Sequence, residues 1–186
     1  MSEQKNELRR EILALRRTMS ENVRKEYDER IYNNLVDLPQ VQNSRTFLVY
    51  SSSGAEVDTR RFINKMLEKE KTVAVPKCVG KQMIFLRIAS LDELVRSSFG
   101  VDEPLNGEEI TEFEGSVCIV PALRFDRDGY RLGWGGGFYD RFLNDYTGYS
   151  VGICYEQCCG KVPRDTYDVN TDIVITENGI YKNTDN

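Results

Sequence analysis

Apolar residues recur along the chain with two different periods, and together they predict alternating helices and strands. Near the N-terminus, apolar residues spaced three or four apart fall on one side of a helix that advances about 100° per residue. This first stripe consists of Leu8, Ile12, Leu15 and Met19. A second stripe follows Ser20, a residue type that favours helix N-caps, and the second helix is expected to end before Pro39.

Short uninterrupted apolar runs predict strands between the helices. These runs are 46–50, 72–75, 83–86, 117–120, 149–154 and 172–176. Pro76 and Pro121 are expected to end two of them, because proline has no N–H group for a strand ladder. Further helices are expected around 62–67, 91–95 and 138–143. Apolar strands that alternate with helices are typical of a parallel sheet covered on both faces, so the sequence predicts an α/β/α sandwich of three layers with a mostly parallel sheet.

The composition narrows the classes of function. At 186 residues the chain is predicted to form one domain, 1–186. Histidine is absent, which excludes a histidine base, triad or metal ligand. A net charge of −5 argues against nucleic-acid binding, and no apolar run approaches the roughly 20 residues of a membrane span. An odd number of cysteines without an apolar signal-peptide core indicates a cytoplasmic protein with reduced thiols.

The cysteines do not predict a metal centre. Cys154, Cys158 and Cys159 cluster in the sequence, but zinc usually takes four ligands and the other two cysteines lie far away along the chain.

Basic residues form a stripe beside the apolar stripe of the first helix. Lys5, Arg9 and Arg16 fall within about 40° of one another, about 70° from the apolar side. If the helix packs through its apolar side, these cations lie next to the seam, where partly desolvated basic groups would suit a phosphate. An ordinary solvated helix face remains the alternative reading.

The segment from Arg131 to Arg141 contains four glycines within positions 133–137. Glycine loses more backbone freedom on folding than other residues, so such a run makes sense where bare backbone approaches a ligand closely. Successive N–H groups before a helix form a nest for phosphate oxygens. The segment matches neither the P-loop nor the Rossmann glycine pattern, and a sharp strand-to-helix turn is the alternative explanation.

Several carboxylates have two readings each. Asp140 is either a surface residue in the first turn of the next helix or a magnesium ligand beside bound phosphates. Glu56 and Asp58 follow a strand at the end where α/β sheets place ligands, or Asp58 caps a helix and Glu56 is solvated. Asp168 and Asp172 are either turn formers or a further magnesium carboxylate.

Taken in order, these motifs resemble the 5-formyltetrahydrofolate cyclo-ligase family, also called methenyltetrahydrofolate synthetase, over nearly the whole chain. The matching pieces are Lys5-x-x-Leu8-Arg9 with Arg16 and Ser20; Tyr50-Ser51 with Glu56–Thr59; Phe99–Pro104; Pro121–Asp126; Gly129–Arg141; and Gln157, Pro163, Asp168, Asp172 and Thr176–Gly179. The resemblance implies a fold like that of sugar-phosphate isomerases and CoA transferases, which agrees with the alternation above.

The resemblance also implies a role for particular residues. Lys5 and Arg9 would hold ATP phosphates and stabilise their charge, and Asp140 and Asp168 would hold Mg²⁺. The ATP-binding set would further include Arg131, Leu132, Gly133, Trp134, Gly135, Gly136, Gly137, Phe138 and Tyr139. The folate would contact Ser51, Glu56, Trp134, Gly135, Gly136, Gly137 and Phe138. Trp134 and Phe138 stand where the family often has tyrosine, so a phenol hydrogen bond at Phe138 is lost while aromatic packing survives.

The implied activity is the ATP- and Mg²⁺-dependent conversion of 5-formyltetrahydrofolate to 5,10-methenyltetrahydrofolate, with release of ADP and phosphate. The expected binding partner is the small-molecule folate, and the protein is expected to be a monomer or a weak dimer. A non-catalytic folate- or nucleotide-binding module and a sugar-phosphate isomerase on a similar fold are the alternatives.

Overall fold

The computed structural model describes residues 3–98 and 100–182, so Phe99 of the 99–104 motif lies outside the described residues. Its centre is a seven-stranded sheet with the order β11-β10-β9-β6-β1-β2-β3. The inner strands pair in parallel, and antiparallel pairs occur at the two edges, β2–β3 and β10–β11. The strands are β1 (Thr46–Val49), β2 (Thr72–Val79), β3 (Gln82–Ile88), β6 (Val117–Pro121), β9 (Tyr149–Ile153), β10 (Ile173–Thr176) and β11 (Gly179–Lys182). This confirms the predicted mostly parallel sheet.

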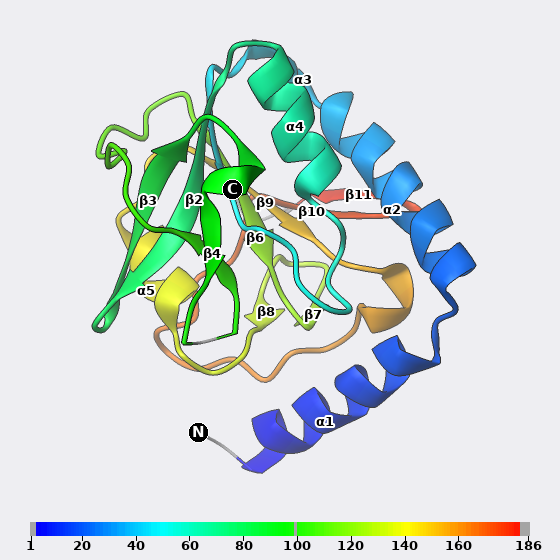
Figure 1. The fold of residues 1–186 in the computed structure, drawn as a ribbon. Helices are drawn as coiled ribbons and strands as arrows, with labels where there is room; N and C mark the ends of the chain where they lie inside the picture. The colour runs from blue at the N-terminus through cyan, green and yellow to red at the C-terminus, as the bar shows by residue number, and fades with distance from the viewer. Residues whose placement is uncertain (1–2, 99, 183–186) are drawn as a thin grey trace.

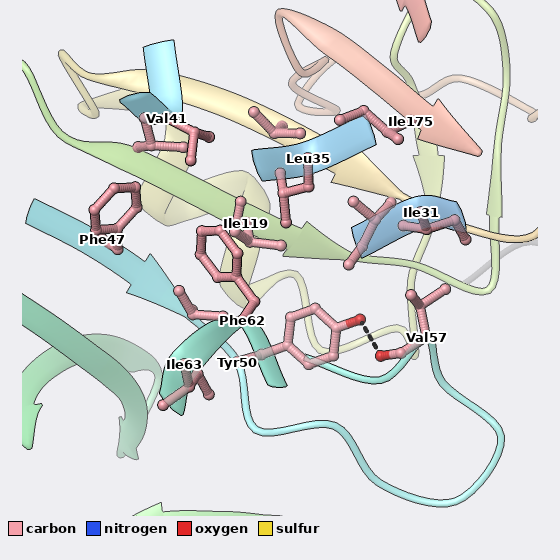
Figure 2. Packing of buried hydrophobic residues seen from close by; sticks show 14 of the residues in the cluster. Ile31, Leu35, Val41, Phe47, Tyr50, Val57, Phe62, Ile63, Ile119 and Ile175 are labelled. Carbon is pink, nitrogen blue, oxygen red and sulfur yellow. Dashed lines mark hydrogen bonds between the residues drawn. The ribbon is translucent and has the colours of Figure 1, made fainter. Parts of the chain in front are cut away.

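Helices cover both faces of the sheet. Figure 1 shows α2 (Glu21–Val36) and α4 (Arg60–Glu68) on one side and α5 (Phe138–Asn144) on the other. The short helix α3 (Pro39–Asn43) lies on the α2 side, where its Val41 joins the same core. Figure 2 shows this core, in which Ile31 and Leu35 of α2 and Phe62 of α4 pack over the strands.

Side-chain alternation along the strands separates the two cores. Phe47 and Val49 of β1 pack under α2 and α4, whereas Leu48 between them packs with Leu143 of α5. All three β1 residues are fully buried, as expected for a strand between two covered faces. The three predicted layers are therefore present.

Helix α1 (Glu3–Thr18) lies across one end of the sheet, beside the short strands β7 (Arg124–Phe125) and β8 (Arg131–Leu132) (Figure 1). Its Ile12 is buried in the core under α2. Its Arg16 is buried as well and donates to the backbone carbonyls of Ala122 and Leu123, which lead into β7. These contacts hold α1 at the edge where the parallel strands end.

Pro121 is the last residue of β6, as expected, whereas Pro76 lies within β2 and does not end it. Pro76 pairs with Phe85 inside the β2–β3 hairpin, and Pro121 pairs with Ile153 at the end of β6. Both lie beyond the last residue of their strand that pairs with β1. Proline has no N–H donor, so it is tolerated where the ladder to a neighbouring strand has already ended.

Other elements differ from the prediction. The expected helix around 91–95 is a 3₁₀ turn, η1 (Leu91–Glu93), followed by β4 (Leu94–Arg96), which pairs with β5 (Asp102–Pro104). The chain also forms η2 (Glu156–Cys158). Within residues 3–98 and 100–182, no helix has the length and apolar character needed to cross a membrane.

Candidate active site

A cleft of about 670 Å³ lies at the carboxyl ends of the central strands. It brings together segments from both halves of the chain: α1, the loop after β1, the end of β6, the glycine segment and the loop before β10. All the predicted site residues line this cleft: Lys5, Arg9, Ser51, Glu56, Arg131, Leu132, Gly133, Trp134, Gly135, Gly136, Gly137, Phe138, Tyr139, Asp140 and Asp168. The structure thus confirms that they share one place, while their individual roles stay predictions.

The basic side chains of Lys5 and Arg9 on α1 bind other groups of the cleft and do not extend into bulk water. Lys5 Nζ lies 2.8 Å from Asp165 Oδ2 and 2.7 Å from Asp168 Oδ2, and its side chain is only 9% exposed. Burial lowers the pKa of Lys5, but the hydrogen bonds to both carboxylates outweigh it, so the pKa is raised. Arg9 Nε donates to the Gly133 carbonyl at 2.8 Å. Lys5 and Arg9 therefore connect α1 to the acidic loop and to the glycine segment.

Arg16 has a different role from the other members of the basic stripe. Its side chain is buried against backbone carbonyls and does not line the cleft. It anchors α1, and a phosphate contact is not expected from it.

The glycines of the segment are needed for different reasons. Gly135 has φ 100° and Gly137, the N-cap of α5, has φ 65°, conformations that side chains disfavour. These two glycines fit the turn explanation. Gly133 has no such φ, and a Cβ placed on it meets nothing within 4 Å. Since neither backbone strain nor packing requires glycine at this position, its bare backbone beside the cleft fits close approach of a ligand.

The backbone donors of this segment are available. Within the described part of the chain, the N–H groups of Gly135, Gly136 and Gly137 have no hydrogen-bond acceptor from the protein. A row of such donors lining a cleft is the arrangement that binds phosphate oxygens.

Arg131 and Asp140 form a mostly buried ion pair beside these glycines. Arg131 Nη2 lies 2.7 Å from Asp140 Oδ1, and the Arg131 side chain is 4% exposed. Burial lowers the pKa of the Arg131 guanidinium, although Asp140 counteracts the shift. The Val169 N–H also donates to Asp140 Oδ1, at 3.3 Å, and so places Asp140 next to the segment that carries Asp168.

Asp140 and Asp168 are suitable as ligands of a magnesium ion. Their side chains are 30% and 18% exposed at the cleft, and carboxylate oxygens are the donors that Mg²⁺ prefers. The described residues contain no group of three or more metal-binding side chains, so such an ion would take its other oxygens from phosphates and water. Asp172, by contrast, is not at the cleft: its Oδ2 accepts from the Ser150 N–H and hydroxyl at the opposite ends of the strands.

A second part of the cleft combines the half-buried carboxylate of Glu56 with an aromatic ring. Trp134 Nε1 donates to Glu56 Oε1 at 3.4 Å, and the Ser53 N–H donates to Glu56 Oε2 at 2.9 Å. Burial raises the pKa of Glu56, and these hydrogen bonds partly offset the rise. Asp58 accepts from the Arg60 N–H in the first turn of α4, as its predicted capping role implies, although the N-cap position itself is Thr59.

Residues that the sequence reasoning did not assign also line the cleft. They include Pro76, Cys78, Met83, Val101, Glu103 and Asp165. The 99–104 sequence motif already indicated the part of the cleft that contains Val101 and Glu103. No sequence pattern indicated that Asp165 pairs with Lys5. Burial raises the pKa of the Cys78 thiol to about 11, and the neighbouring Glu103 adds to the rise.

The cysteine cluster is separate from the cleft. Cys154 Sγ and Cys159 Sγ lie 3.4 Å apart, and all five cysteines are free. Within the described residues, this cluster is not part of any group of three or more metal-binding side chains placed to hold an ion.

The comparisons with known proteins agree with one another. Residues 1–177 match the model of the 5-formyltetrahydrofolate cyclo-ligase family. The 5-formyltetrahydrofolate cyclo-ligase of Escherichia coli K12 is 28% identical, over 92% of this chain and 99% of its own. A probable 5-formyltetrahydrofolate cyclo-ligase of Schizosaccharomyces pombe is 26% identical, over 98% of this chain and all of its own.

Solved structures give the same result. The NMR structure of the Aquifex aeolicus 5,10-methenyltetrahydrofolate synthetase aligns with a TM-score of 0.86 and 34% identity, over 98% of this chain and 94% of that one. The Mycoplasma pneumoniae 5,10-methenyltetrahydrofolate synthetase aligns with a TM-score of 0.75 and 25% identity, over 93% and 98%. The chain therefore belongs to the 5-formyltetrahydrofolate cyclo-ligase family.

Proposed function

We propose that this protein converts 5-formyltetrahydrofolate to 5,10-methenyltetrahydrofolate with consumption of ATP, in the presence of Mg²⁺, and with release of ADP and phosphate. The family and the relatives indicate cyclo-ligase activity. The observation that carries the proposal is the composition of the cleft. One part holds basic side chains, glycine N–H groups and two carboxylates, and the other holds Glu56 and Trp134 among apolar residues.

The chemistry explains why a chain without histidine can serve. The N5-formyl group is an amide, and its oxygen is a poor leaving group. Transfer of the γ-phosphoryl group of ATP to that oxygen makes it a good one. N10 of the same folate then attacks the formyl carbon, the carbon–oxygen bond breaks, phosphate leaves and N10 loses its proton. Because the folate supplies the nucleophile, the protein only positions the reactants and neutralises charge.

The residues of the phosphate part would act on the charge of the transferred group. Lys5 and Arg9 would donate to phosphate oxygens, and the Gly135–Gly137 N–H groups would hold the phosphate chain. Asp140 and Asp168 would hold Mg²⁺, which supplies charge neutralisation at the phosphates when it is bound. Lys5 already lies 2.7 Å from Asp168, so an ammonium group and a metal-binding carboxylate are close together before any ligand arrives.

The residues of the other part would orient the folate. Trp134 is 60% exposed and offers its ring for stacking, and the Glu56 carboxylate can accept hydrogen bonds from ring nitrogens. Ser51 lies at the same wall. Holding the formyl oxygen against the γ-phosphate is the positioning effect on which the reaction depends.

An absorbance assay at the methenyl band of the product tests this function. The band is expected to grow only when 5-formyltetrahydrofolate, ATP and Mg²⁺ are all present, with one ADP formed per product. Folate binding without turnover would instead support a non-catalytic module. Absence of any dependence on folate or nucleotide would contradict the proposal and leave the sugar-phosphate isomerase reading.

A further inference from the structure

The loop of residues 52–58, here called the Glu56 loop, is held from outside along its backbone. Side chains from other elements bind its consecutive peptide groups from Gly54 to Asp58. The pairs are Arg24 to the Gly54 carbonyl, Arg16 to the Ala55 carbonyl, Tyr155 to the Glu56 carbonyl, Tyr50 to the Val57 carbonyl (Figure 2) and the Asp58 N–H to Asp28. The path of the loop is therefore set by its surroundings and not by its own sequence alone.

Two of these partners converge on the peptide of Glu56 and its neighbours. The Tyr155 hydroxyl donates to Asp28 Oδ1 at 2.8 Å and shares the same proton more weakly with the Glu56 carbonyl oxygen at 3.3 Å. Asp28 Oδ1 also accepts the Asp58 N–H, at 3.1 Å. Asp28 comes from α2 and Tyr155 from the turn after β9, so these two elements meet at the loop that carries the cleft carboxylate.

Burying a carboxylate and a phenol at this position costs desolvation free energy that an apolar pair would not cost. The Tyr155 side chain is fully buried, and burial raises the pKa of the Asp28 carboxyl, which shows that its charge is partly desolvated. Apolar side chains could fill the same space. What a carboxylate and a phenol add is a defined direction for the peptide groups that they bind.

We propose that Asp28 and Tyr155 are positioning residues that aim Glu56 and its partner Trp134 at the folate. This inference rests on the proposed function, because it assumes that Glu56 contacts the substrate. It predicts that loss of the Tyr155 hydroxyl weakens folate binding selectively. Nucleotide binding, which depends on α1 and the glycine segment, is expected to change little.

The chain offers a matched pair of variants. Tyr155→Phe removes the hydroxyl and keeps the ring. Tyr27→Phe makes the same change at the adjacent ring, whose centroid lies 6.3 Å away, and the Tyr27 hydroxyl makes no hydrogen bond within the described residues. Tyr155→Phe is expected to raise the KM for 5-formyltetrahydrofolate about tenfold, with kcat and the KM for ATP within about threefold of the wild type. Tyr27→Phe is expected to match the wild type in all three.

A spectroscopic signal tests the inference without turnover. Trp134 is the only tryptophan of the chain, and it donates to Glu56, so its emission reports the position of that carboxylate. Tyr155→Phe is expected to shift this emission in the ligand-free protein, and Tyr27→Phe is not. Asp28→Asn, which keeps an acceptor oxygen, is expected to retain more folate affinity than Asp28→Ala.

The outcomes separate the two proposals. If the Tyr155→Phe variant has the same tryptophan emission and the same KM for folate as the Tyr27→Phe variant, the positioning role is overturned. An equal rise in both KM values together with a lower melting temperature would also overturn it, because that result shows general loosening. If the wild type fails to turn over folate, the proposed function fails, and the emission comparison still decides whether the Tyr155 hydroxyl positions Glu56.

Discussion

Replacing Lys5 by alanine should separate catalysis from stability. Lys5 is held by Asp165 and Asp168, and in the proposed reaction its ammonium group donates to the transferred phosphoryl group. Loss of one donor that stabilises developing charge costs about 2–4 kcal/mol of transition-state binding. At about 1.36 kcal/mol per factor of ten, kcat/KM for ATP should fall about 30-fold to about 900-fold.

The structure predicts a much smaller loss of folding stability. The Asp165 side chain is 66% exposed, and ion pairs of such exposed groups contribute about 0–1 kcal/mol. Asp168 is 18% exposed and keeps the Asp165 N–H as a partner at 2.8 Å, so the pair does not leave a bare buried charge. We expect the melting temperature to fall by only about 2–4 °C, for a loss near 1 kcal/mol.

The assay measures initial rates at the methenyl band over a range of ATP concentrations, with thermal unfolding recorded for each variant. Arg10→Ala is the matched control, because Arg10 is an exposed cation on the same helix and does not line the cleft. Its kcat/KM should match that of the wild type. If Lys5→Ala retains kcat/KM within about threefold of the wild type, the assignment of Lys5 to the phosphates is refuted.

A Cβ on Gly133 meets nothing within 4 Å, so Gly133→Ala should keep the melting temperature but weaken nucleotide binding in calorimetry. Gly137→Ala, at φ 65°, should instead cost about 1 kcal/mol of stability. Normal nucleotide binding by Gly133→Ala would count against close backbone contact. Cys78, with a pKa of about 11, should react with iodoacetamide near pH 8 about a hundredfold more slowly than a thiol of pKa 9.0, and faster as pH rises; a pH-independent rate would contradict this. Phe62→Ala should lower the free energy of unfolding by about 3–5 kcal/mol in urea titrations, against less than about 0.5 kcal/mol for Leu105→Ala, whose side chain is largely exposed; similar losses would contradict the core assignment.

The fold was predictable because its inner strands are apolar on both faces, as in Phe47–Val49. The parts that were missed carry weaker signals. The edge strand β11 alternates between half-buried and exposed residues over only four positions, which is too short a pattern to identify. The second helix does end before Pro39, as expected, but proline also suits the first turn of a helix, and α3, which begins at Pro39, was missed.

The site was predictable where one segment carries the chemistry, as the glycine segment does. Its partners depend on tertiary structure, which no local pattern reveals. Asp165 faces Lys5 across 160 positions of sequence, and Tyr155 reaches the Glu56 carbonyl across 99. Such pairs follow from how β9, α1 and α2 pack at the sheet edge, and not from the spacing of residues.

The most direct test of the account is a crystal structure with a non-hydrolysable ATP analogue and Mg²⁺. We predict that the phosphates lie against the N–H groups of Gly135–Gly137, that Lys5 and Arg9 donate to them, and that Asp140 and Asp168 ligate the metal. Phosphates bound away from the glycine segment, with Lys5 still paired to Asp165 and Asp168, would contradict the account.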